Sequence, residues 1–271
     1  MPAPRFRRGA GHLWRSCMSA QETLQALLEM TQTLGEPARE LVIIGEGNTS
    51  SRIDEDSFWI KASGRSMAAI DADCFVAVRL KPILALLELE GDSTAHQQAM
   101  IDAKVDPSSS ARPSVEVTFH AMLLHECADW GIRVIAHTHP VAVNQILCSG
   151  RAQEFAERRI FPDQVVVCGP RSVFLPYIDP GPPLARAMRE ALRGYIAQEG
   201  EPPKTILLAN HGLIALAASP REALNITMMT VKAAKIFAGA AAIGEPTFMS
   251  QADIDHIYKR PDEIFRRKSW G

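Results

Sequence analysis

The sequence lacks an excess of charge of either sign and lacks a cysteine framework. Its 271 residues include 29 Lys plus Arg and 31 Asp plus Glu, for a formal net charge of -2. Because no global basic field is available to recruit nucleic acid or anionic lipid, we expect neither kind of partner. The five cysteines are odd in number and have no CxxC spacing. They argue against a disulfide framework and a zinc ribbon, and they favour a reducing cytoplasm.

Long apolar runs are missing as well. A run of about 18 to 20 apolar residues is needed to span a bilayer, and the best candidate, Leu207 to Leu216, is interrupted by Asn210 and His211. Repeats with a period of 20 to 50 residues are also absent. Since 46% of the residues are hydrophobic, the chain has enough apolar material for a core. We therefore expect a folded protein without a membrane segment.

The two ends of the chain differ from its middle. Residues 1–17 contain glycines, prolines and four arginines, but no apolar segment like that of a secretory signal. We interpret them as a disordered arm; the alternatives are a transit peptide and an over-long gene prediction with the true start at Met18. Residues 251–271 are interpreted as a charged C-terminal tail. Because no linker divides the rest, residues 18–250 are predicted to form a single domain.

The hydropathy pattern predicts helices that alternate with strands. Helices are expected over 20–34, 82–90, 115–130, 184–198 and 220–244. Strands are expected over 41–44, 58–61, 133–136, 164–168, 173–177, 205–209 and 213–217. The polar stretch 91–112 is predicted to be a surface loop. This order indicates an α/β domain with a mixed sheet and helices on both faces.

Three of the eight histidines lie where predicted strands end. His137 and His139 are one residue apart, so strand alternation points both imidazoles to the same side. His211 interrupts two apolar runs, and a buried strand end is a costly place for an imidazole without a partner. Three neutral imidazoles and one carboxylate would suit Zn²⁺ or a similar divalent ion, and Glu116 is the candidate carboxylate. From the residues alone, ordinary surface or hydrogen-bonded histidines remain the alternative.

Five short motifs occur in the order typical of one protein family. They are GEGN at 45–48, ASG at 62–64, PSVE at 113–116, HTHP at 137–140 and NHG at 210–212. Over about residues 24–244 the sequence therefore resembles the class II aldolase and adducin family, which includes fuculose-phosphate aldolase. The resemblance implies a three-layer α/β/α sandwich with a central mixed, largely antiparallel sheet. It also implies a cyclic homotetramer with active sites at subunit interfaces.

The same resemblance implies roles for individual residues. His137, His139 and His211 would hold one divalent metal ion per chain, with Zn²⁺ expected ahead of Mn²⁺ and Mg²⁺. Glu116 would both approach the metal and move the proton. Asp163 falls in the region where some relatives supply an acid or base from the neighbouring subunit. His120 lies one turn from Glu116 and is expected to orient it.

The resemblance also implies a set of residues that bind the substrate's phosphate. The matching positions are Gly47, Asn48, Ser63, Gly64 and Ser114. Two departures stand out, because Glu46 adds a negative charge beside the anion site and Val115 replaces a hydroxyl residue common in the phosphosugar aldolases. Lys61 and Arg65 could offset the charge of Glu46, whether the substrate's anion is a phosphate or a carboxylate.

These features predict a metal-dependent carbon–carbon lyase that cleaves a small ketose phosphate through an enediolate. A decarboxylase of a β-oxo or aromatic hydroxy acid would use the same metal site. Sugar-phosphate epimerases and dehydratases are further alternatives, although the epimerases resembled carry a shorter aspartate in place of Glu116. A non-catalytic assembly module, as in adducin, is the alternative from another class, and the presence of all three histidines and Glu116 argues against it.

Overall fold

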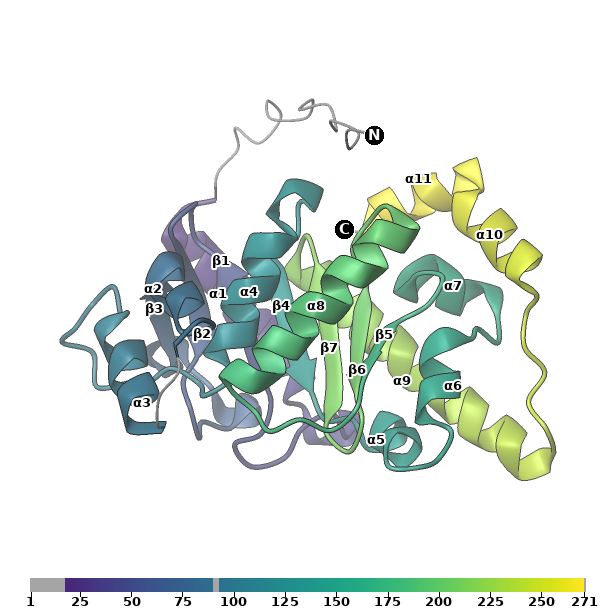
Figure 1. The fold of residues 1–271 in the computed structure, drawn as a ribbon, viewed down its shortest axis with the longest axis horizontal. Coiled ribbons are helices and arrows are strands. Elements are labelled where there is room, and N and C mark those ends of the chain that lie inside the picture. The colour runs from purple at the N-terminus through teal and green to yellow at the C-terminus, as the bar shows by residue number, and fades with distance from the viewer. Residues whose placement is uncertain (1–17, 90–92, 271) are drawn as a thin grey trace.

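A mixed seven-stranded sheet lies at the centre of the structure, a computed structural model that describes residues 18–89 and 93–270 (Figure 1). The strand order is β3-β2-β1-β4-β7-β6-β5. Its strands are β1 (Asn48–Arg52), β2 (Ser57–Lys61), β3 (Phe75–Arg79), β4 (Val134–Thr138), β5 (Val173–Leu175), β6 (Thr205–Leu208) and β7 (Gly212–Ala217). Only β5 and β6 pair in parallel; the other neighbouring pairs are antiparallel. The prediction of a mixed, largely antiparallel sheet is confirmed.

Helices surround this sheet. They are α1 (Ala20–Leu34), α2 (Leu80–Ala85), α3 (Ser93–Asp102), α4 (Val117–Glu126), α5 (Val141–Leu147), α6 (Ala152–Glu157), α7 (Pro162–Cys168), α8 (Pro182–Glu199), α9 (Pro220–Ile243), α10 (Gln251–Lys259) and α11 (Pro261–Trp270). The arm predicted over residues 1–17 lies outside the described residues.

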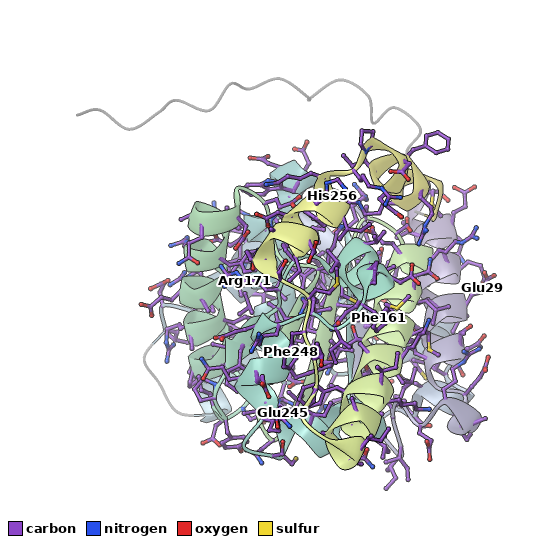
Figure 2. The ribbon with its side chains drawn as sticks, turned by 90° about the vertical axis from the view of Figure 1, so that its right-hand side faces the viewer. Glu29, Phe161, Arg171, Glu245, Phe248 and His256 are labelled. Atoms are coloured by element: carbon purple, nitrogen blue, oxygen red, sulfur yellow. The ribbon has the colours of Figure 1, made fainter. Side chains whose placement is uncertain are left out.

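Each face of the sheet has its own hydrophobic core. Alternation along β7 sends Ile214 and Leu216 to one face and Leu213 and Ala215 to the other. Helices α2, α4 and α8 cover the first face, and α1, α5 and α9 cover the second. Figure 2, turned by 90°, shows the long helices α8 and α9 on opposite sides of the sheet. The predicted three-layer α/β/α sandwich is therefore confirmed.

Helix α9 is the most apolar long element. The Ser219 hydroxyl accepts a hydrogen bond from the Glu222 amide at 3.1 Å, and Pro220 occupies the first turn, which together define the start of the helix. By length and composition alone α9 could cross a membrane. In this fold it packs against β4, β7 and α1 and buries Ile226, Val231 and other side chains in the core. This packing accounts for part of its apolar composition, while Ile236 and Ile243 stay exposed.

The strand predicted over 41–44 is wrong, because this segment bends instead of pairing. Its backbone is tied to the end of β4, where the His139 amide donates to the Leu41 carbonyl at 2.9 Å. Ile44 has a left-handed φ of 56° and is 83% exposed. A β-branched residue in this conformation is unusual. The apolar pattern misled the prediction because Ile43 and Ile44 point to solvent instead of a core.

The strand predicted over 164–168 is also wrong, because these residues form helix α7. Pro162 at the first helical position starts the helix. Val165 and Val166 are buried in a small cluster with Ile254 and Ile257 of α10. Tertiary packing therefore overrides the strand propensity of the β-branched run.

Two segments contain helices where the sequence predicted a loop and a tail. Helix α3 lies within the stretch predicted to be a loop, although residues 91 and 92 are outside the described part. Helices α10 and α11 form the C-terminal segment and pack on α7. The signal for α10 was present in the sequence, because the Ser250 hydroxyl caps it by accepting from the Asp253 amide at 3.2 Å.

Candidate metal centre

Two neighbouring strands bring the three histidines together at one end of the sheet. Strands β4 and β7 are paired so that His137 lies opposite Ile214 and Thr138 opposite Leu213. His139 follows β4 directly, and His211 lies in the short connection that leads into β7. Asn210, with a left-handed φ of 55°, helps the chain to reverse there. The antiparallel pairing of β4 with β7 thus brings His211 next to His137 and His139, although they are far apart in the sequence.

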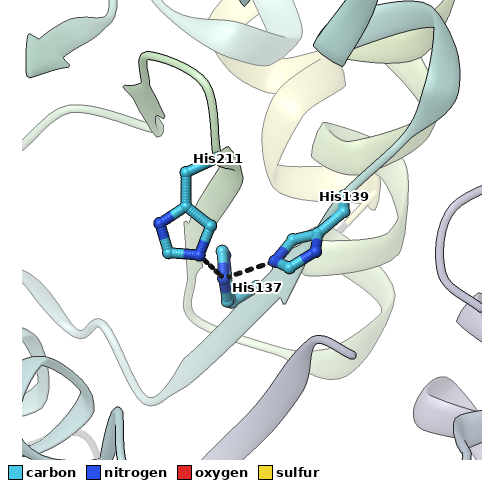
Figure 3. Close-up of side chains that lie close together, drawn as sticks. All are labelled: His137, His139 and His211. Carbon is cyan, nitrogen blue, oxygen red and sulfur yellow. Dashed lines mark hydrogen bonds between the residues drawn. The ribbon is translucent and has the colours of Figure 1, made fainter. Parts of the chain in front are cut away.

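The three imidazoles point at one another (Figure 3). His137 Nε2 lies 3.0 Å from His139 Nε2 and 3.2 Å from His211 Nε2. One ligand atom from each histidine lies within 4.8 Å of the other two. The prediction that these histidines converge is supported by this geometry.

The tautomers of two histidines are fixed from outside the cluster. His137 Nδ1 lies 3.0 Å from the Leu213 carbonyl oxygen, and His139 Nδ1 lies 3.0 Å from Glu46 Oε2. Because these oxygens can only accept, each Nδ1 carries the proton and each Nε2 presents a lone pair to the cluster. Burial lowers the pKa of His137 to about 3, which keeps its ring neutral. Because the Nε2 lone pairs of His137 and His139 face each other, the two rings could bind one cation together.

Glu116 completes the donor set from the other side. Its Oε2 lies 3.5 Å from His137 Nε2, and its Oε1 lies 3.3 Å from His211 Nε2. Glu116 Oε1 is buried without a hydrogen-bond partner. Burial raises the pKa of Glu116, but its contacts with His137 and His211 and the hydrogen bond from Asn48 together lower it by more. Three nitrogens and a carboxylate oxygen with no other partner fit Zn²⁺ or a similar divalent ion.

A buried chain of hydrogen bonds holds Glu116 in place. The Asn48 amide donates to Glu116 Oε2 at 2.6 Å and to Ser114 Oγ at 3.1 Å. His120 donates from Nε2 to the Asn48 side-chain oxygen, and its Nδ1 accepts from Ser50 Oγ at 2.7 Å. Burial lowers the pKa of His120 to about 3, so the ring is neutral. His120 therefore orients Glu116 indirectly, through Asn48.

The predicted anion-binding positions divide into two groups. Asn48 is buried and commits both amide hydrogens to Glu116 and Ser114. Ser63 and Gly64, by contrast, line an open hollow of about 440 Å³ together with Arg65 and Arg112. The sequence analysis did not single out Arg112. Its place is set by the pairing of Ala62 with Pro113, which brings two distant segments side by side.

Lys61 and Gly47 make close contacts with the backbone of neighbouring loops. Lys61 is only 1% exposed, and its ammonium donates at 3.4 Å to the carbonyls of Gly45 and Ala62. Burial lowers the pKa of Lys61 to about 8. Gly47 has a φ of +68°, and a Cβ there would lie 2.8 Å from the His137 carbonyl oxygen. Glycine is therefore required for the loop to approach β4 so closely.

Asp163 lies elsewhere in the chain. It is in the first turn of α7, and its carboxylate accepts from Arg266 of α11 at 2.7 Å. The structure thus places it in an ion pair between helices instead of with the histidines. Its assignment as an acid or base stays a prediction about a neighbouring subunit.

Replacing Gly212 by alanine should disrupt the centre. A Cβ at this position would lie 2.6 Å from the Thr138 carbonyl oxygen and 2.8 Å from His139 Cδ2. We expect a loss of about 1 to 3 kcal/mol in the free energy of unfolding, because backbone must shift to relieve the clash. Urea unfolding measures this loss.

The matched control is Gly239→Ala, since no atom lies within 4 Å of a Cβ built on that residue of α9. This substitution should raise the free energy of unfolding by about 0.5 to 1 kcal/mol, because alanine is favoured over glycine inside a helix. Equal unfolding midpoints for the two variants would contradict the steric role of Gly212.

Comparisons with known proteins agree with this architecture. The chain is 20% identical to YgbL of Klebsiella pneumoniae, described as a putative aldolase/epimerase/decarboxylase, with a TM-score of 0.67 over 89% of this chain and 99% of that one. An L-fuculose 1-phosphate aldolase is 22% identical, with a TM-score of 0.66 over 93% and 99% of the two chains. At these identities the similarity establishes the fold.

A relative known from its sequence is much longer than this chain. The protein named "uncharacterized oxidoreductase YuxG", from Bacillus subtilis (strain 168), is 25% identical over 234 residues, which are 83% of this chain and 31% of that protein. This chain thus matches about a third of the relative's length. The family model for the class II aldolase and adducin N-terminal domain matches residues 25–238. The chain therefore belongs to the class II aldolase and adducin family.

Proposed function

We propose that the protein is a carbon–carbon lyase that depends on a divalent metal ion and cleaves a small ketose phosphate. The observation that carries this proposal is the convergence of the three histidine Nε2 atoms on a buried carboxylate. A cation held by His137, His139 and His211 would act as a Lewis acid that stabilises negative charge on substrate oxygens. An assembly module would have no need for such a donor set.

Glu116 is the proposed acid and base. Its Oε2 is held by the Asn48 amide, whereas its Oε1 has no hydrogen-bond partner and is free to accept or deliver a proton. Because the fixed oxygen prevents rotation of the carboxylate, Oε1 keeps a single direction toward the histidines. The proton would move between this oxygen and the substrate carbon next to the cleaved bond.

The anionic end of the substrate is proposed to bind in the hollow beside this centre. Ser63 offers a hydroxyl and Gly64 a backbone amide there, while the Ser63 amide already donates to the Arg112 carbonyl at 3.0 Å, and Arg65 and Arg112 supply positive charge. Lys61 adds a buried ammonium that no carboxylate of the described residues neutralises by direct contact. Their combined charge favours an anion over a neutral sugar.

A decarboxylase of a β-oxo acid is the second candidate. Asn48 has no amide hydrogen left for a phosphate, and the exposed Val115 adds no hydroxyl. These two features reduce the number of hydrogen-bond donors available to a doubly charged phosphate. The smaller, singly charged carboxylate needs fewer donors than a phosphate does.

Product analysis distinguishes these reactions. The purified protein is incubated with ketose 1-phosphates and with β-oxo acids, each with Zn²⁺, Mn²⁺ or Mg²⁺, while aldehyde and carbon dioxide release are recorded. We expect release of aldehyde from a ketose phosphate, loss of this activity with EDTA and recovery with one divalent ion per chain. Carbon dioxide as the only product would establish the second candidate. A product with the carbon number of the substrate would indicate an epimerase or dehydratase, and absence of both turnover and bound metal would contradict the enzyme proposal.

A further inference from the structure

We propose that Glu46 is a positioning residue, which holds His139 by its Nδ1 atom and thereby tightens the binding of the divalent ion. This inference rests on the proposed function, because it requires a metal at the three histidines. It concerns a residue that the sequence analysis treated only as an unfavourable charge beside the anion site.

Both oxygens of the Glu46 carboxylate have a defined partner. Oε2 lies 3.0 Å from His139 Nδ1, and Oε1 accepts from the Ile43 amide at 2.7 Å. The side chains of Glu46 and His139 are only 30% and 19% exposed. Both carboxylate oxygens are therefore held by a partner, and one of them faces the metal centre.

The sheet register explains why these two residues meet. Strands β1 and β4 are antiparallel, with Asn48 opposite His137 and Thr49 opposite Ala136. Continuing this register by two residues brings position 46 level with position 139. The pairing that builds the core thus also delivers Glu46 to His139.

The loop before β1 is held in this position by close backbone contacts. A Cβ on Gly45 would lie 3.0 Å from the Gly64 backbone, so the two turns touch. Ile44 keeps a left-handed φ of 56° although its side chain is 83% exposed. A strained backbone persists only where its surroundings fix it, and here the strained residue lies two positions before Glu46.

A carboxylate on Nδ1 affects a metal ligand in two ways. It fixes the ring so that Nε2 faces the cluster, and its negative charge makes Nε2 a better donor to a cation. The corresponding acceptor for His137 is the Leu213 carbonyl, which is neutral. Glu46 thus supplies a charged partner, and substitution of such a partner reduces metal affinity by about 10- to 100-fold.

The test is the Zn²⁺ affinity of the purified full chain, measured by competition with a chelator of known affinity. Glu46→Ala should weaken Zn²⁺ binding about 10- to 100-fold, and Glu46→Gln should give a loss at least as large. Because the glutamine oxygen can still accept from the Ile43 amide, its NH2 group then faces the Nδ1–H of His139 and cannot replace the lost acceptor, so Glu46→Gln keeps the support of the loop and removes only the hold on the ring. The melting temperature of the metal-free Glu46→Gln protein should match that of the wild type.

Two controls make the result specific. Glu36→Gln removes the same charge from a surface pair with Arg39 and should leave Zn²⁺ affinity unchanged. In a His139→Ala background, Glu46→Ala should cause no further loss of affinity, because the residue it positions is gone.

The outcomes separate the two proposals. A wild-type protein that binds no Zn²⁺ would overturn the proposed function and this inference together. A wild type that binds Zn²⁺ with the same affinity as Glu46→Ala would overturn the role of Glu46 alone. An equal loss from Glu46→Ala in both backgrounds would also overturn it, since the effect would not pass through His139.

Discussion

A protein with His211→Ala should lose its divalent ion while keeping its fold. His211 supplies the only ligand atom from the β6–β7 connection, and its Nε2 is within 3.3 Å of both His137 Nε2 and Glu116 Oε1. Without it the cation would keep two of three nitrogen ligands. We expect Zn²⁺ affinity to fall by more than about 100-fold, beyond the range typical for residues that only support a ligand. Elemental analysis and chelator competition measure the loss.

The matched control is His125→Ala, since His125 is exposed near the end of α4. It removes one imidazole away from the cluster and should leave both metal content and affinity unchanged. The metal-free His211→Ala and wild-type proteins should melt at similar temperatures, because the surrounding core does not depend on this side chain. Full metal content in His211→Ala would refute the assignment of the centre.

In the Glu116→Gln variant, turnover should drop by about 10²- to 10⁴-fold while the ion stays bound. The three imidazoles are retained, and glutamine has nearly the shape of glutamate. An amide at position 116 cannot take up the proton that the carboxylate would accept, so the contribution of a general base is lost. Metal content and kcat are measured on the same samples, so that loss of rate is separated from loss of metal.

Glu126→Gln is the control for this second experiment. Glu126 is the last residue of α4, the helix that begins directly after Glu116, and it pairs with Arg193 at the surface, at 2.6 Å. A surface pair contributes little to stability, so we expect wild-type turnover. An unchanged rate in Glu116→Gln would remove Glu116 from the proton transfer, whereas loss of metal would show that its main role is as a ligand.

The sequence predicted the parts of the site that depend on local pattern. His137 and His139 follow an apolar strand, and alternation alone places their rings on one side. To place His211 beside them, the prediction needed only one more assumption, that the end of a second strand lies next to the end of the first. The partners of these histidines were harder to predict, because Glu46 contacts His139 through a strand register that no local pattern reveals.

The errors in the predicted fold have a shared physical cause. Val165 and Val166 favour a strand by propensity, and Ile43 and Ile44 form an apolar run, yet the first pair lies in a helix and the second is exposed. In both places contacts from distant segments decide the conformation. Helix α3 was missed for a related reason, since its apolar residues are too sparse to give a helical period.

The strand order has a consequence for the assembly of the molecule. The central strands β1, β4 and β7 come from the early, middle and late parts of the chain, and the histidines and Glu46 become neighbours only when all three are paired. Forming such distant pairings is slow compared with local helix formation. A newly synthesised chain should therefore bind the proposed ion late, and that ion should then stabilise the completed sheet by mass action.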